Sequence, residues 1–163
     1  TPYYRKDVED SLKPLPHQKV FYSYIEYLDF KPFSKASFDT DIKEAKTALL
    51  LCGIANTYSL EDFLKRKYNT FSKIQFHDHH DFTEKDIDMV IEKYNDIIGK
   101  NKVIITTEKD AMRLINSSFI NKFDDIPVFT KSIFTRMMKQ TSTTKFLIMS
   151  EGILQTTKSK LNQ

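Results

Sequence analysis

Short apolar runs alternate with amphipathic helical segments along the middle of this sequence, and this order constrains the fold more than any other feature. The run at 47–52, TALLLC, is followed by Gly53 and is typical of a strand buried on both faces. Further strands are predicted at 71–76, 102–106 and 126–133. Because strands and helices alternate, we predict an α/β fold, a three-layer sandwich with a mainly parallel, Rossmann-like sheet.

Three helices are predicted between these strands. Ser59 precedes the first, whose apolar residues recur at helical spacing: Leu60, Phe63, Leu64 and Tyr68. Thr83 opens the second with a pattern similar to a capping box, and Thr107 opens the third. The tetrapeptide TEKD occurs at both of these starts. We interpret it as shared capping chemistry rather than as an internal repeat.

An aromatic segment precedes the alternating region. Residues 1–18 predict a short helix closed by the KPLPH breaker, and residues 19–33 are rich in aromatic and β-branched side chains and predict one or two strands. Such an arm has to pack on something, so a sheet edge or an interdomain arm is favoured over a base-stacking platform. We therefore divide the chain into a helix and β linker arm at 1–40 and an α/β domain at 41–163.

Charge and cysteine content exclude several classes of protein. The 25 basic and 22 acidic side chains leave a net charge of only +3, which argues against a nucleic-acid partner. The single cysteine, Cys52, excludes a disulfide framework and a zinc site of several thiolates, and we expect it to be buried and inert. No apolar run approaches the roughly 20 residues of a membrane helix, and no signal peptide is present, which leaves a soluble or peripheral protein.

The two ends of the sequence carry less information. The chain begins with Thr1 rather than methionine, which suggests a segment of a longer reading frame. After Phe134 the pattern fades: the FLIM run at 146–149 fits a strand or part of a helix, and the last dozen residues are polar. We expect these last residues to form a frayed end.

Glycine is scarce, and this excludes the common phosphate-binding loops. The three glycines, Gly53, Gly99 and Gly152, are too far apart for GxGxxG or GxxxxGK[ST]. If the protein uses a nucleotide, its phosphate loop lies elsewhere. We expect Gly53 to supply a positive φ angle at the end of a strand.

The polar residues of interest follow three of the predicted strands. Residues 53–56 follow the first, HDHHD at 77–81 follows the second, and TTEKD at 106–110 follows the third. Ligands of open α/β sheets bind outside the carboxyl ends of the strands, where helix amino termini favour anions. We therefore expect the three loops to converge on one edge of the sheet.

These loops leave several chemical readings open. The HDHHD run could bind a divalent metal, pair a carboxylate with an imidazole for proton transfer, or be a plain polar loop in which His77 takes no part. Lys109 opposes the helix dipole in a first turn, by ~0.3–1 kcal/mol when exposed. An ion pair or a phosphate contact would compensate this unfavourable interaction of Lys109 with the helix dipole. Asn56 could cap the helix that follows it.

Three blocks of the sequence resemble one known family. LLLCGIANTYSLEDFL, FHDHHDFTEKDI and IITTEKDAMRL are similar, in order and spacing, to the carboxyl-terminal half of tetraacyldisaccharide 4′-kinase, the lipid A kinase. The resemblance covers residues 1–131. It implies an enzyme of lipid A and lipopolysaccharide biosynthesis that transfers the γ-phosphate of ATP to the 4′-hydroxyl of a tetraacyldisaccharide 1-phosphate. It also implies peripheral association with the cytoplasmic face of the bacterial inner membrane.

The resemblance further implies which residues act. His79 matches the histidine that supports a catalytic aspartate on the preceding P-loop domain, and Asp78 assists it as the second catalytic residue. Cofactor binding is expected along the interdomain cleft, from Thr107, Glu108, Lys109 and Asp110, with Asn56 added to this set. ATP and Mg²⁺ would be bound mainly by the missing P-loop half, so no metal ligand is assigned here. The chain alone is expected to be inactive.

Two other classes remain open at this point. DHH also names a family of manganese phosphoesterases, although only the weak pair Asp39 and Asp41 lies upstream to supply further ligands. The other alternative is a noncatalytic binding module. Without the preceding domain, the aromatic arm could also pair with a second copy and give a homodimer.

Overall fold

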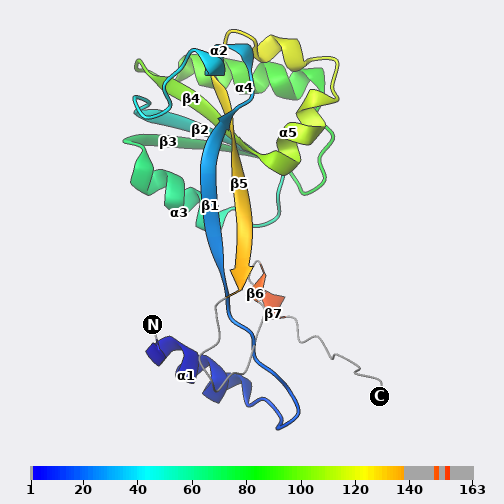
Figure 1. Ribbon diagram of the computed structural model, residues 1–163. Coiled ribbons are helices and arrows are strands. Elements are labelled where there is room, and N and C mark those ends of the chain that lie inside the picture. The colour runs from blue at the N-terminus through cyan, green and yellow to red at the C-terminus, as the bar shows by residue number, and fades with distance from the viewer. Residues whose placement is uncertain (1, 138–148, 151–152, 155–163) are drawn as a thin grey trace. The chain divides into compact units, whose positions relative to one another are not determined.

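A computed structural model describes residues 2–137, 149–150 and 153–154 of the 163 (Figure 1). The chain divides into two compact units, and each is described by itself. One unit is Tyr27–Ile133, which contains every residue of the predicted site. The other comprises the segments on either side of it. The predicted boundary between an arm at 1–40 and a domain at 41–163 stays a prediction.

The sheet contains five strands in the order β1-β5-β4-β2-β3. Their bounds are Ser23–Pro32 for β1, Thr47–Cys52 for β2, Thr70–Gln75 for β3, Lys102–Thr107 for β4 and Val128–Met137 for β5. The pairs β2·β3, β2·β4 and β4·β5 are parallel. This confirms the mainly parallel sheet, and it places β4 and β3 on either side of β2.

Strand β1 pairs with β5 of the same chain and runs antiparallel to it. The amide of Phe33, just after β1, donates to the carbonyl of Val128 at the start of β5 at 2.9 Å. At the other end Arg136 pairs with Glu26. The predicted aromatic arm therefore contains one long strand that occupies a sheet edge, as in the first of the two favoured readings.

Helices cover both faces of the sheet (Figure 1). Helix α3, Tyr58–Lys67, buries Leu60 and Leu64 against one face, whereas α4, Glu84–Asp96, and α5, Glu108–Ile115, pack on the other. Strand β2 serves both cores because it is buried at all six positions: Leu49 and Leu51 face α4, and Ala48, Leu50 and Cys52 face α3. The three-layer sandwich is confirmed.

Local chemistry explains where two of these helices begin. Thr83 and Asp86 form a complete capping box at the start of α4, and the Thr107 side chain accepts from the amide of Asp110 at the start of α5. Both predicted starts are therefore confirmed. Two short elements had no clear sequence pattern, namely α2, Lys35–Phe38, and the 3-10 helix η1, Ile120–Phe123.

The second unit contains the predicted short amino-terminal helix, α1, at Pro2–Leu12. It also contains two short antiparallel strands, β6 at Met149–Ser150 and β7 at Ile153–Leu154. Most of the FLIM run, 146–148, and the expected frayed end at 155–163 lie outside the described residues. Among the described helices, none has the length and apolar character needed to cross a bilayer.

Candidate functional site

The loops after β2, β3 and β4 meet at the carboxyl edge of the sheet. The amide of Gly53, after β2, donates to Asp110 on α5 at 3.0 Å. Lys109 of α5 donates to Asp78, in the loop after β3, at 2.9 Å. Arg113, one turn further along α5, lies 3.0 Å from a ring nitrogen of His79. The predicted convergence of the three loops is therefore present, and α5 is the element that holds them together.

Asp110 is the centre of this arrangement and has no exposed surface. Its Oδ2 accepts from the Gly53 amide and, at 2.7 Å, from the Thr107 hydroxyl. Its Oδ1 lies 3.4 Å from the Arg113 guanidinium. A buried carboxylate needs such partners, because leaving one unpaired costs several kcal/mol. Asp110 therefore joins two loops from inside the domain rather than facing solvent.

Gly53 fits a crowded position, which differs from the role predicted for it. Its φ angle is not positive, in contrast to that of Gly99, which is +130°. Instead, a Cβ at position 53 would lie 3.2 Å from Asp110 Oδ1 and 3.3 Å from the carbonyl oxygen of His77. The prediction of a positive φ at Gly53 is wrong, since the constraint is close approach of two loops.

His79 lies at the exposed tip of the loop after β3. Its φ angle is +60°, in the left-handed region that non-glycine residues seldom adopt, and its side chain is 74% exposed. The Asp78 carboxylate holds this turn by accepting from the His79 amide at 3.0 Å. Its ion pair with Lys109 is the main cause that lowers the pKa of Asp78. The loop thus presents an imidazole beside a carboxylate that stays ionised.

Of the other two loop histidines, His80 packs against the domain, whereas His77 is exposed. The His80 ring stacks on Phe76 at 4.5 Å between centroids, and its Nε2 lies 2.9 Å from Asp86. Its Nδ1 lies 2.9 Å from Nε2 of His77. Burial raises the pKa of Asp86, but hydrogen bonds from Thr83 and His80 outweigh it, and the net direction is down. His80 therefore ties the loop to the start of α4.

The remaining predicted site residues contact other parts of the domain. Glu108 accepts from Ser132 and Lys31, which lower its pKa in that order of importance. Lys109 has the ion pair that was one of its two predicted compensations, and the phosphate contact stays a prediction. Asn56 accepts from the amide of Tyr58, the first residue of α3, at 3.0 Å.

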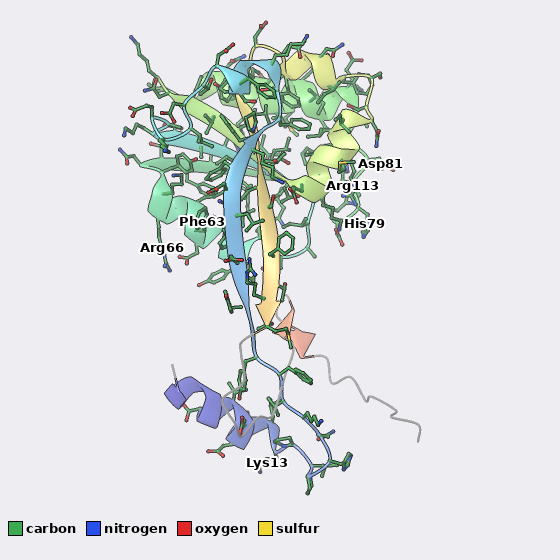
Figure 2. All side chains as sticks on the ribbon, viewed as in Figure 1. Lys13, Phe63, Arg66, His79, Asp81 and Arg113 are labelled. Carbon is green, nitrogen blue, oxygen red and sulfur yellow. The ribbon has the colours of Figure 1, made fainter. Side chains whose placement is uncertain are left out.

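Arg113 is the residue that sequence reasoning missed. It follows Asp110 by three positions and Lys109 by four, so it lies on the same face of α5. That spacing was the available signal. Only the fold shows that His79 lies next to it, and Figure 2 shows the two side chains close together, away from Arg66 on α3.

The loop histidines and carboxylates do not assemble into a metal site. Within residues 2–137 and the short described segments beyond them, no group of three His, Cys, Asp or Glu side chains is placed to hold a metal ion. Members of the HDHHD run have other partners instead: His80 contacts His77 and Asp86, and Asp78 contacts Lys109. Cys52 is buried, and burial raises its pKa to about 12, as expected for an inert thiol.

The fold and the converging loops define an α/β domain of the open-sheet class, in which three consecutive loops meet at the carboxyl edge of the sheet. Comparison with known proteins then identifies the family. The sequence model of the family Tetraacyldisaccharide-1-P 4'-kinase matches residues 6–151, so the chain belongs to this family. No solved structure gives a significant match.

Curated relatives named Tetraacyldisaccharide 4'-kinase agree with this assignment. The relative from Bacteroides thetaiotaomicron is 29% identical over 117 residues, which are 66% of this chain and 31% of the relative. That from Porphyromonas gingivalis W83 is 31% identical over 128 residues, 73% of this chain and 35% of the relative. That from Flavobacterium psychrophilum is 37% identical over 124 residues, 75% of this chain and 33% of the relative. The chain spans about a third of the length of the relatives it matches.

These matches confirm the resemblance stated from the sequence. They favour the kinase reading over a DHH-type phosphoesterase. They do not test the roles of individual residues, so the catalytic roles of His79 and Asp78 and the cofactor-binding roles of Asn56 and Thr107–Asp110 remain predictions.

Proposed function

We propose that this chain is the carboxyl-terminal part of an ATP-dependent kinase that phosphorylates the 4′-hydroxyl of a tetraacyldisaccharide 1-phosphate in lipid A biosynthesis. The observation that carries the proposal is the exposed imidazole of His79, held at the tip of a braced loop in a chain of this family. A side chain prepared in this way suits contact with a group outside the domain.

In this proposal His79 acts on a partner domain. Its imidazole supports a catalytic aspartate of the P-loop half, and Asp78 keeps the loop in shape through its contacts with the His79 amide and with Lys109. Of the TEKD residues, the exposed Glu108 and Lys109 would face the cleft between the halves, whereas the buried Thr107 and Asp110 would hold this edge from inside the domain. Phosphoryl transfer depends mainly on positioning and electrostatic stabilisation, so a braced histidine can contribute as a proton-transfer partner of the aspartate without bonding to the phosphoryl group.

The phosphates and the metal belong mostly to the other half in this proposal. ATP would bring the transferable phosphoryl group, and Mg²⁺ would neutralise its charge. The described residues offer no metal cluster, and Lys109 is already paired with Asp78, so we assign no step through the metal to this chain. The lipid substrate implies peripheral association with the cytoplasmic face of the inner membrane.

A phosphoryl-transfer assay with labelled ATP and the lipid disaccharide tests the proposal. The chain alone should transfer no phosphate, whereas the full-length kinase should be active. His79→Ala in the full-length kinase should lower kcat by about 10² or more, the usual loss of a proton-transfer partner, with little change in KM for ATP. The matched control is His17→Ala, because His17 lies outside the Tyr27–Ile133 unit.

Two results would contradict the proposal. Transfer by the chain alone would show that the P-loop half is not needed. An unchanged kcat for His79→Ala would remove His79 from the mechanism. If ATP or partner binding were retained as well, that result would favour the binding module. Light scattering on the isolated chain would show separately whether it forms the homodimer expected of an arm without its partner.

A further inference from the structure

Two basic side chains of α5 contact two consecutive residues of the histidine loop. Lys109 donates to Asp78 at 2.9 Å, and Arg113 lies 3.0 Å from Nδ1 of His79. Residues four positions apart lie on the same face of a helix, so both contacts come from one side of α5. The loop is therefore held at two adjacent points by one rigid element.

Arg113 also contacts a buried carboxylate inside the domain. Its Nη1 lies 3.4 Å from Oδ1 of the fully buried Asp110, while its Nη2 reaches His79. The Arg113 side chain is only 20% exposed. Asp110 in turn is fixed by the Gly53 amide and the Thr107 hydroxyl. A continuous path of polar contacts thus leads from the interior of the domain to the exposed imidazole.

The chemistry of this path determines where the proton of His79 lies. A guanidinium group only donates hydrogen bonds, so Nδ1 of His79 must accept. The proton of the neutral imidazole then lies on Nε2, which is 3.6 Å from Asp78 Oδ2. The exposed nitrogen is therefore a donor, oriented by a contact on the opposite side of the ring.

We propose that Arg113 is a positioning residue that fixes both the ring orientation and the Nε2–H tautomer of His79, with Asp110 as its anchor. The kinetic consequence rests on the proposed function, because it requires His79 to act in phosphoryl transfer. The effect on the tautomer does not, because it follows from the contacts within this chain.

The competing explanation is that Arg113 only neutralises the buried Asp110. Arg113→Lys separates the two, because a lysine can keep one ion pair but cannot supply two donors in the planar fork of a guanidinium. If Arg113 positions His79, the lysine variant should fold normally and lose turnover. If it only neutralises Asp110, the variant should match the wild type in both respects.

The kinetic test uses the full-length kinase. Arg113→Lys should lower kcat about tenfold and leave both KM values within about twofold, since only part of the contribution of His79 is lost. In a His79→Ala background the same change should lower kcat no further, because the residue it acts through is gone. Arg66→Lys is the matched control: Arg66 pairs with Asp62 on the exposed surface of α3.

A second measurement does not depend on kinase activity. Nitrogen-15 NMR of the His79 imidazole, recorded at a pH at which the ring is neutral, should show only the Nε2–H tautomer in the wild type. It should show a mixture of both tautomers in Arg113→Lys. Identical tautomer populations in the two proteins, or a further loss of kcat in the His79→Ala background, would overturn the proposal. An inactive wild-type kinase with the expected tautomer change would instead refute only the proposed function.

Discussion

The carboxylate of Asp110 accepts a hydrogen bond from the backbone amide of Gly53 at 3.0 Å, although the two residues are 57 positions apart in the chain. This contact joins the loop after β2 to the first turn of α5. Arg113 and Thr107 contact the same carboxylate. One buried side chain therefore connects the loop after β2, the start of α5 and the arginine that contacts His79.

We predict that Asp110→Ala lowers the free energy of unfolding by about 3–5 kcal/mol, the usual cost of removing one partner of a buried ion pair. The variant would leave the Gly53 amide and the Arg113 guanidinium without their acceptor. Urea unfolding followed by circular dichroism would measure the loss. The matched control is Asp88→Ala, because Asp88 is 58% exposed and its pair with Lys122 should contribute less than about 1 kcal/mol. Equal losses in the two variants would contradict a central role for Asp110.

The elements of the fold could be predicted because their signals are local. The buried run at 47–52 and the capping residues Thr83 and Thr107 lie within a few positions of the structure they specify. The convergence of the three loops could also be predicted, because a parallel sheet brings the carboxyl ends of neighbouring strands together.

The pairing of side chains at this edge could not be predicted in the same way. The role of Gly53 depends on the distance to Asp110, and the role of Arg113 depends on the position of a loop that lies 34 residues away in sequence. His80 could not be placed from the sequence either, since its sequence neighbours are polar but its ring stacks on Phe76. These contacts depend on tertiary packing, which spacing along a helix or strand does not encode.

Two neighbouring threonines should respond in opposite ways to the same substitution. The hydroxyl of Thr106 is buried and has no hydrogen-bond partner among the described residues, whereas that of Thr107 donates to Asp110 and accepts from its amide. Thr106→Val should therefore raise the free energy of unfolding by about 1 kcal/mol, and Thr107→Val should lower it by about 1–2 kcal/mol. Differential scanning calorimetry would compare them, and a destabilised Thr106→Val would show that its hydroxyl is bonded.

Glu61 should contribute to acid sensitivity. Hydrogen bonds from Lys73 and then Thr57 lower its pKa from 4.5 to about 2. Because the unfolded chain binds more protons below pH 4.5, the stabilisation by Glu61 is complete above that pH and is lost as the pH falls toward 2. Urea unfolding at pH 6 and pH 3 should show that Glu61→Gln reduces the difference between the two. Lys73→Met should also reduce the difference in stability between pH 6 and pH 3. An unchanged difference in both variants would contradict a stabilising ion pair between Glu61 and Lys73.

Lys131 should make the protein more stable at alkaline pH. The residue is only 3% exposed, and its ammonium group lies 3.9 Å from the centroid of the Phe30 ring and donates to the carbonyl of Leu28. Burial lowers its pKa below the ordinary 10.5. Between the lowered value and 10.5 the unfolded chain therefore binds more protons than the folded one, and stability rises with pH. From pH 7 to 10 the free energy of unfolding of the wild type should increase relative to that of Lys131→Met. Tyrosine ionisation affects both proteins alike, so parallel curves would mean that this lysine keeps its ordinary affinity for protons.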